Sequence, residues 1–155
     1  MELFSADYQL RSGNFDEAGR LIATGRELAT AEDRFQFEIA DGLRLAPMGN
    51  HAEARRVWEQ YKDSPPGFWD HLIILAAQIG EVESAVNVIK HSDIYANYRY
   101  LTVERRLSPL YTQPVFQALL RERYAKWVAD LKRFGSSLAP PPPAVLSPDE
   151  ILRQH

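Results

Sequence analysis

The sequence predicts an all-α fold that repeats one helical hairpin three times and then closes with further helices. The phrase "GNFDEAGRLI", which begins at Gly13, returns as "GNHAEARRVW" from Gly49 and as "GEVESAVNVI" from Gly80, at intervals of 36 and 31 residues. Repeats of this length are typical of stacked helical hairpins. Apolar residues also recur at three- and four-residue steps through residues 114–134, which is the period of an amphipathic helix.

The glycine of each phrase marks the turn between the two helices of a hairpin. Glycine lacks a Cβ and therefore ends a helix in the left-handed conformation at little cost. Asn14 and Asn50 follow the first two glycines, and Glu17 and Glu53 lie three residues further on. This spacing is typical of a capping box, so we expect these pairs to cap the second helices.

Small and large apolar residues then follow at fixed distances from the glycine. An alanine comes after five residues and a large apolar residue one helical turn later; these pairs are Ala18 and Ile22, Ala54 and Trp58, and Ala85 and Ile89. Seven residues before the glycine, two units have a very small residue, Ala6 and Gly42, whereas the third has Ile73. The small residues let antiparallel helices approach closely, and we predict repeat units at about residues 1–31, 34–66 and 67–94.

The segment after the repeats predicts helices that close the end of the stack. Residues 94–107 are expected to form one helix, ended by the Ser108-Pro109 step. Pro114 then opens a long helix whose apolar stripe consists of Phe116, Leu119, Leu120, Tyr124, Trp127, Val128 and Leu131. Its other faces carry Arg121, Arg123, Lys126, Lys132 and Arg133. Because the last repeat of a solenoid exposes its core, residues 94–134 are predicted to be capping helices.

Residues 135–155 form a proline-rich tail that we expect to be flexible. Gly135 ends the preceding helix, and the four prolines at 140–143 favour an extended polyproline conformation. Ser147 and Glu150 have the spacing of a capping box and predict one helical turn that runs through Gln154. The proline run is expected to be a stiff spacer, with a ligand for a proline-binding domain as the alternative.

The hairpins resemble the tetratricopeptide repeat (TPR) family over about residues 1–95. The matching residues are Ala6, Gly13, Phe15, Ala18 and Ile22 in the first unit, Gly42, Gly49, Ala54, Trp58 and Pro66 in the second, and Trp69, Leu72, Gly80, Ala85 and Ile89 in the third. His51 and Val82 stand where the family has an aromatic residue, and Ile73 replaces its small residue. The resemblance implies a right-handed superhelix of TPR-like antiparallel helical hairpins with C-terminal capping helices, as one domain over residues 1–134.

The resemblance also implies a function in protein–protein interaction. In this family the first helix of each hairpin lines a concave groove that binds peptides or helices of partner proteins. The matching positions are Leu3, Asp7, Leu10, Gln36, Ile39, Leu43, Ala46, Asp70, Ile74 and Ala77. They are mostly apolar or acidic, unlike the lysine, asparagine and arginine of members that clamp acidic chaperone C-termini. We therefore expect a non-enzymatic scaffold or adaptor that binds an amphipathic helix or a hydrophobic peptide.

Two other functions and one assembly state stay open. The segment "LSPLYTQPVFQALLRER" resembles the closing element of many bacterial TPR proteins, and such repeats often form the C-terminal portion of larger signalling proteins. The chain would then be a sensory or regulatory part of a transcription regulator or nucleotide cyclase. The basic helix could contact nucleic acid, because residues 95–134 hold 8 Lys/Arg against 3 Asp/Glu, whereas residues 1–94 hold 9 against 16. Solenoid ends and grooves also pair readily, so a homodimer stays open.

Motifs for catalysis, metals and cofactors are missing from the sequence. There is no cysteine, and no phosphate-binding, dinucleotide-binding or nucleophile-elbow pattern is present. His51, His71 and His91 recur every 20 residues but fall at different places in the predicted hairpins, so they are not expected to converge on a metal. The longest strongly apolar run, residues 72–77, is too short to span a membrane, and the first residues do not form a signal peptide. We expect a cytoplasmic protein that is not an enzyme and has no cofactor.

Overall fold

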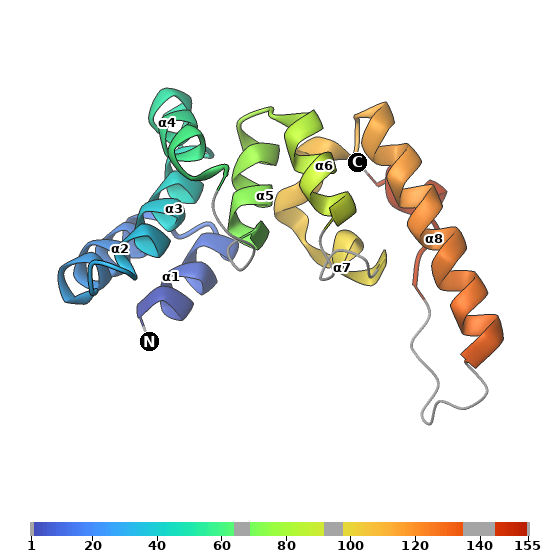
Figure 1. The fold of residues 1–155 in the computed structure, drawn as a ribbon, viewed down its shortest axis with the longest axis horizontal. Coiled ribbons are helices and arrows are strands. Elements are labelled where there is room, and N and C mark those ends of the chain that lie inside the picture. The colour runs from blue at the N-terminus through green and yellow to red at the C-terminus, as the bar shows by residue number, and fades with distance from the viewer. Residues whose placement is uncertain (1, 64–68, 92–97, 135–144, 155) are drawn as a thin grey trace. The chain divides into compact units, whose positions relative to one another are not determined.

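A computed structural model of the protein describes residues 2–63, 69–91, 98–134 and 145–154. All regular secondary structure in these ranges is helical, as the sequence predicts (Figure 1). The chain falls into two compact units, residues 1–81 (unit 1) and 82–155 (unit 2), which are described in turn. The boundary between the units lies inside the third predicted repeat.

Unit 1 contains two complete helical hairpins and one further helix. Its helices are α1 (Glu2–Arg11), α2 (Phe15–Leu28), α3 (Arg34–Leu45), α4 (His51–Tyr61) and α5 (Trp69–Gln78). α1 packs against α2 and α3 packs against α4, and α2 also contacts α3. α3 contacts α1 and α5 as well, so the first helices of the hairpins are neighbours (Figure 1).

The turns that end α1, α3 and α5 are built alike and confirm the role predicted for the glycines. Gly13, Gly49 and Gly80 have φ of 74°, 84° and 83°. In the first turn the Gly13 N–H donates to the Leu10 carbonyl at 3.2 Å, and the Asn14 N–H donates to the Gln9 carbonyl at 2.9 Å. These two bonds form a Schellman motif, and the other two turns repeat it. A Cβ would meet nothing within 4 Å at these positions, so the positive φ, not space, requires glycine.

The capping boxes predicted for Asn14 and Asn50 are wrong. Both residues occupy N-cap positions, but neither side chain accepts a hydrogen bond from its helix. In each case the backbone N–H is already donated across the Schellman turn, to the Gln9 and Leu45 carbonyls. A capping box needs that same N–H for the glutamate carboxylate. Glu17 instead accepts from Arg20 Nε at 2.8 Å, on the surface of α2.

The small residues of the repeats allow the close helix packing that the sequence predicts. The three alanines Ala18, Ala54 and Ala85 are fully buried, and the apolar residues one turn later, Ile22, Trp58 and Ile89, are at most 3% exposed. A Cβ on Gly42 would lie 3.1 Å from Leu75 Cδ2 and 3.1 Å from Val57 Cγ1. That approach is closer than ordinary van der Waals contact, so α3 could meet its neighbours here only with a very small residue.

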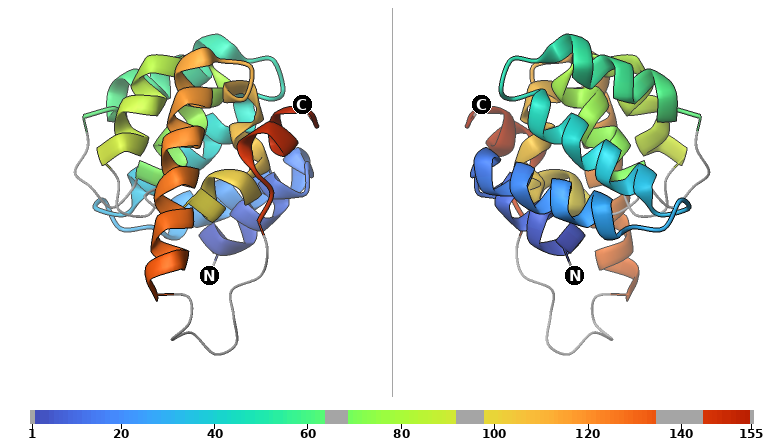
Figure 2. Two further views of the ribbon diagram at one scale, coloured as in Figure 1. Left: turned by 90° about the vertical axis from the view of Figure 1, so that its right-hand side faces the viewer. Right: turned by 90° about the vertical axis from the view of Figure 1, so that its left-hand side faces the viewer.

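Unit 2 is less regular. Its elements are α6 (Val82–His91), α7 (Tyr98–Val103), the 3-10 helix η2 (Arg105–Leu110), α8 (Pro114–Phe134) and α9 (Pro148–Leu152). The long helix α8 packs against α6, α7 and α9 (Figure 2). α8 begins at Pro114, as predicted, and Phe116, Leu119 and Leu120 of its apolar stripe are buried. The four stripe residues that follow, Tyr124, Trp127, Val128 and Leu131, are half-buried.

The prediction of a single helix over residues 94–107 is wrong for the residues that the structure describes. α7 ends at Val103, and η2 then contains the Ser108-Pro109 step that was expected to end the helix. Glu104 separates the two, with extended backbone at φ −82° and ψ 91°. Its carboxylate accepts the backbone N–H of Arg106 at 3.1 Å and thereby caps η2. Residues 94–97 lie outside the described ranges.

Part of the predicted tail is an element of unit 2. α9 begins with the predicted capping box, in which Glu150 N–H donates to Ser147 Oγ at 3.4 Å and Ser147 N–H donates to Glu150 Oε2 at 2.8 Å. Ile151 of this helix is only 4% exposed, whereas the sequence predicts a flexible tail here. Gly135 and the prolines at 140–143 lie outside the described residues.

Candidate protein-binding surface in unit 1

The ten residues expected to line a groove all lie in unit 1, and six of them are buried. Leu10, Ile39, Leu43, Ala46, Ile74 and Ala77 are each at most 6% exposed. Side chains this deeply buried contribute to packing and offer a partner little surface. The part of the prediction that concerns accessible surface therefore rests on the other four residues.

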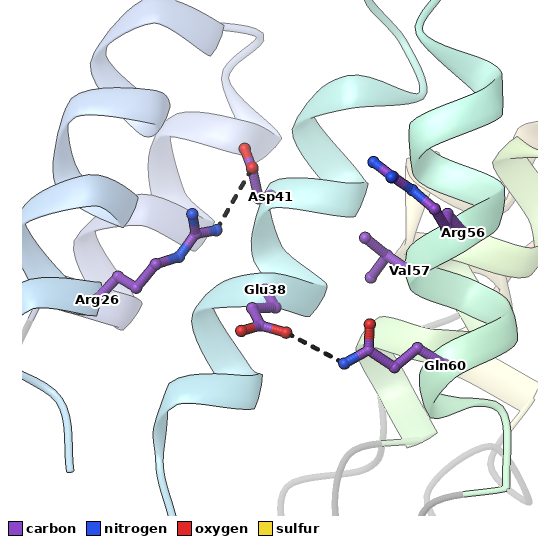
Figure 3. Close-up of a pocket in the computed structure, with 6 residues that line it drawn as sticks. All are labelled: Arg26, Glu38, Asp41, Arg56, Val57 and Gln60. Atoms are coloured by element: carbon purple, nitrogen blue, oxygen red, sulfur yellow. Dashed lines mark hydrogen bonds and ion pairs between the residues drawn. The ribbon is translucent and has the colours of Figure 1, made fainter. Parts of the chain in front are cut away.

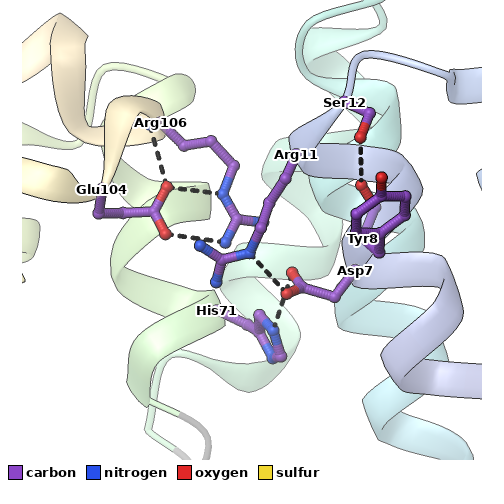
Figure 4. Close-up of polar contacts among 7 residues, drawn as sticks. All are labelled: Asp7, Tyr8, Arg11, Ser12, His71, Glu104 and Arg106. Carbon is purple, nitrogen blue, oxygen red and sulfur yellow. Dashed lines mark hydrogen bonds and ion pairs between the residues drawn. The ribbon is translucent and has the colours of Figure 1, made fainter.

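Leu3, Asp7, Gln36 and Asp70 keep part of their surface exposed. Asp7 accepts a hydrogen bond from Arg11 Nε at 2.8 Å, and its other carboxylate oxygen lies 3.5 Å from His71 Nε2 (Figure 4). Asp70 lies in the first turn of α5. Leu3 and Gln36 are the two that the structure brings together, because both line one pocket.

This pocket lies where α1 begins, α2 ends and α3 begins, and its volume is about 340 Å³. We call it the α1–α3 pocket. Its apolar lining includes Leu3 and Phe4 from α1, Leu28 from α2 and Phe37 from α3. Phe37 is 9% exposed, whereas Phe4 is 86% and Leu28 is 72% exposed. The pocket thus has a buried aromatic ring among its walls and two large apolar side chains in the solvent.

The shape of the pocket depends on Gly25 of α2. A Cβ at this position would overlap the ring of Phe37, so the ring packs directly on the glycine backbone. The α2–α3 connection beside it is ordered by Asp33, which accepts hydrogen bonds from Thr30 Oγ1 at 2.8 Å and from Gln36 Nε2 at 3.3 Å. A glycine inside a helix costs stability. Gly25 within the helical pattern of α2 is therefore the feature by which the sequence could have indicated this site.

Apolar and acidic groups surround the pocket. Tyr8 is 67% exposed and follows Phe4 by one turn of α1, so the two rings lie on the same side of that helix. Glu2 and Asp33 are the ionisable residues among those that line the pocket in the described part of the chain, and both are acidic. The surface therefore combines exposed apolar side chains with negative charge.

A second pocket of unit 1, with a volume of about 290 Å³, lies between α2, α3 and α4 and is polar (Figure 3). Arg26 Nη2 lies 3.4 Å from Asp41 Oδ2, and Asp41 also accepts from Arg44 Nε at 2.8 Å. Glu38 accepts from Gln60 Nε2 at 3.5 Å and from the hydroxyl of Tyr61. Burial, and then the hydrogen bond to Glu38, raises the pKa of Tyr61 to about 12. Arg26 and Asp41 are thus paired with each other, and Glu38 is held by two neutral side chains.

The ionisable groups of unit 2 also form internal contacts. Glu104 is 3% exposed, and its two carboxylate oxygens accept from Arg106 Nε at 2.9 Å and Nη2 at 3.0 Å (Figure 4). On the basic face of α8, Arg123 Nη2 donates to the Lys90 carbonyl at 3.2 Å, and Arg121 Nη2 lies 3.5 Å from Asp149 Oδ1. Lys126, Lys132 and Arg133 are exposed.

His51, His71 and His91 belong to three different helices, α4, α5 and α6. His51 and His91 are exposed, the latter with Nδ1 at 2.8 Å from the Asn87 carbonyl, and His71 contacts Asp7. Within the described ranges, no three or more His, Asp or Glu side chains gather closely enough to hold a metal ion. Nor do these ranges contain a helix that combines the length and the apolar character needed to cross a membrane.

Comparisons with protein-family models, with curated proteins and with solved structures gave no match to this chain.

Proposed function

We propose that the protein is a non-enzymatic interaction module, a TPR-like superhelix whose first unit binds an amphipathic helix of a partner protein at the α1–α3 pocket. The observation that carries this proposal is the exposure of Phe4 and Leu28 beside a pocket that also contains Leu3 and Phe37. Large apolar side chains gathered at a cavity are typical of sites that another protein covers.

The apolar side chains can supply useful binding energy. Covering an exposed Phe or Leu side chain contributes about 1.5–3 kcal/mol. Phe4 and Leu28 together contribute about 3–6 kcal/mol before the cost of association and side-chain ordering is subtracted, so they support weak, reversible binding. That strength suits an adaptor that binds and releases its partner.

The charge of the surface defines the partner further. Glu2 and Asp33 line the pocket, and unit 1 as a whole holds 14 Asp/Glu against 8 Lys/Arg. A basic segment is attracted to such a surface, and an acidic segment is repelled. We therefore expect the partner helix to present apolar residues on one face and Lys or Arg beside them.

The binding site proposed here lies at the end of the surface that the family resemblance implies. It includes Leu3 and Gln36 but not the central residues Ile39, Leu43 and Ile74, which are buried. The same site would serve a free adaptor or a regulatory segment of a longer chain. Whether the protein contacts nucleic acid through α8 stays a separate prediction.

Site-specific photo-crosslinking tests the proposal in the native extract. A photoreactive amino acid replaces Leu28 in one sample and Val103 in another, because Val103 is a comparably exposed apolar residue of unit 2, at 66%. The crosslinked segment is then identified by mass spectrometry. We expect the Leu28 probe, and not the Val103 probe, to capture one segment with an apolar face and basic flanks. Equal capture from both positions, or capture of an acidic segment at Leu28, would contradict the proposal.

A further inference from the structure

Within unit 2, the segment around α9 contacts α7 and α8 in the way a bound peptide does. The Tyr98 hydroxyl of α7 donates a hydrogen bond to the Leu146 carbonyl at 2.7 Å, and Pro148 and Ile151 are buried. α9 packs against α8, where Arg121 Nη2 lies 3.5 Å from Asp149 Oδ1. A backbone carbonyl and a carboxylate of this segment are thus each held by a side chain of α7 or α8, and two of its apolar side chains are buried.

The surface that receives this segment is built from two helices. Tyr98 of α7 packs against Tyr124 of α8, with ring centroids 5.1 Å apart and planes tilted by 59°. We call the surface formed by Tyr98, Arg121 and Tyr124 the α9-binding face. Burial is the main reason why the pKa of Tyr98 is raised, and the charge of the nearby Glu150 adds to it. The Tyr98 hydroxyl therefore keeps the proton that it donates to the Leu146 carbonyl.

The segment satisfies its own helix start. Ser147 and Glu150 form a complete capping box, and Pro148 stands at the first helical position, where its fixed φ favours a helix. The turn consequently needs no group of α7 or α8 to hold its N-terminal shape. A short segment with this pattern can adopt the bound conformation wherever it occurs in a chain.

The attachment of the segment is modest. Among the described residues it includes one buried aliphatic side chain, one buried proline, one hydrogen bond and one ion pair whose side chains are 54% and 71% exposed. Exposed ion pairs contribute little to stability. Ten residues of chain connect the segment to α8 and hold it at an effective concentration of about millimolar order, so a competing segment replaces it by binding the same surface more tightly.

We propose that the α9-binding face is a peptide-binding site which residues 145–152 occupy as an intramolecular ligand, and that a partner segment of the same chemistry displaces them. That segment has a capping serine, a proline, two acidic residues and an aliphatic residue four positions after the serine. The site is separate from the α1–α3 pocket, so either proposal can fail alone.

A peptide-exchange experiment with the full chain tests this inference. The probe is a fluorescently labelled peptide with the sequence of residues 145–155, "VLSPDEILRQH". It is titrated against the wild-type chain and against the full chain carrying Ile151→Asp, which removes the aliphatic anchor of the internal segment. We expect the Ile151→Asp chain to bind the probe at least tenfold more tightly than the wild type, because its own segment no longer competes. Fluorescence anisotropy gives both affinities.

Two controls make the result specific. A chain with Gln154→Ala, at an exposed position two residues beyond the segment, should behave as the wild type does. A probe peptide with the Ile151→Asp change should bind neither chain. Failure of the wild-type probe to bind the Ile151→Asp chain would overturn the proposal. So would loss of the helical circular dichroism of that chain, because a displaceable segment cannot be essential for folding.

Discussion

The two units differ at the α1–α3 pocket and the α9-binding face. Unit 1 leaves Phe4, Tyr8 and Leu28 in the solvent around the α1–α3 pocket, whereas unit 2 covers the α9-binding face with a segment of its own chain. A stack of helices has apolar surface at its faces and ends that something must cover. Under the two proposals made above, unit 1 binds its partner directly, whereas unit 2 first releases residues 145–152.

The units also differ in how they turn the chain. Unit 1 closes α1, α3 and α5 with backbone hydrogen bonds at three glycines. Unit 2 turns from α7 into η2 with one buried side chain, Glu104, which binds both the backbone and the guanidinium of Arg106. The glycine that each backbone turn requires recurs along the sequence, whereas a turn made by one carboxylate leaves no repeated pattern.

The largest effect should come from charging the buried centre of unit 1. Leu43 is 2% exposed, so Leu43→Asp is expected to lower the free energy of unfolding by about 4 kcal/mol or more. Phe4→Asp, at an 86% exposed position, should change it by no more than about 0.5 kcal/mol. Urea denaturation followed by circular dichroism measures both. Equal stability of the two variants would mean that the accessible surface of unit 1 has been misplaced.

The second-largest difference in stability should come from removing one carboxylate in each unit. Glu104→Ala removes a 3% exposed carboxylate from beside the Arg106 guanidinium, and is expected to destabilise unit 2 by about 3 kcal/mol. Asp7→Ala in unit 1 removes a more exposed carboxylate, with 22% of its side chain in solvent, and should cost at most about 1 kcal/mol. The same denaturation measurement compares them. A smaller loss for Glu104→Ala than for Asp7→Ala would contradict the structural role given to Glu104.

Two glycines of α2 offer a finer comparison within unit 1. Gly25→Ala places a Cβ against the ring of Phe37 and should cost about 1–3 kcal/mol. Gly19→Ala meets only the flexible side chain of Arg44, nearest at 3.3 Å, and should stabilise α2 by about 0.5 kcal/mol. Thermal unfolding of both variants gives the sign of each change. If Gly25→Ala is neutral, Phe37 does not hold its place in the pocket wall as described.

The smallest predicted effect is a loss of stability at alkaline pH, to which one buried tyrosine in each unit contributes. Burial raises the pKa of Tyr111 to about 12, as burial and Glu38 do for Tyr61. Because the folded-state pKa lies above the ordinary value of about 10, each neutral phenol contributes stability that is complete below pH ~10 and is lost as the pH rises towards ~12. Tyr61→Phe and Tyr111→Phe should each make this loss shallower. Denaturation across that pH range measures the slope, and an unchanged slope would refute the raised pKa.

The sequence predicts the repeated parts of the fold well, for a physical reason. The turns are marked by Gly13, Gly49 and Gly80 because a positive φ restricts the residue type. The close helix contacts are marked by buried alanines because the limited space between the helices also restricts the residue type. The capping role of Asn14 was misjudged because the sequence does not show that its N–H is already used in the Schellman turn.

The candidate site was harder to predict from the sequence. The family resemblance places Leu3 and Gln36 on the binding surface, and both line the α1–α3 pocket. It cannot indicate which apolar residues stay exposed, because Leu28 at 72% and Leu43 at 2% are the same residue type in similar helical patterns. Burial of Ile151 likewise depends on a contact between segments far apart in the sequence.

Binding of a designed peptide to unit 1 within the full chain tests the central claim most directly. The peptide is an amphipathic helix with leucines on one face and lysines beside them, and its control has glutamates in place of the lysines. We expect the lysine peptide to bind the wild type and to bind Leu28→Ser at least tenfold more weakly, with Val103→Ser unaffected. Equal binding to Leu28→Ser and the wild type, or tighter binding of the glutamate peptide, would contradict the account.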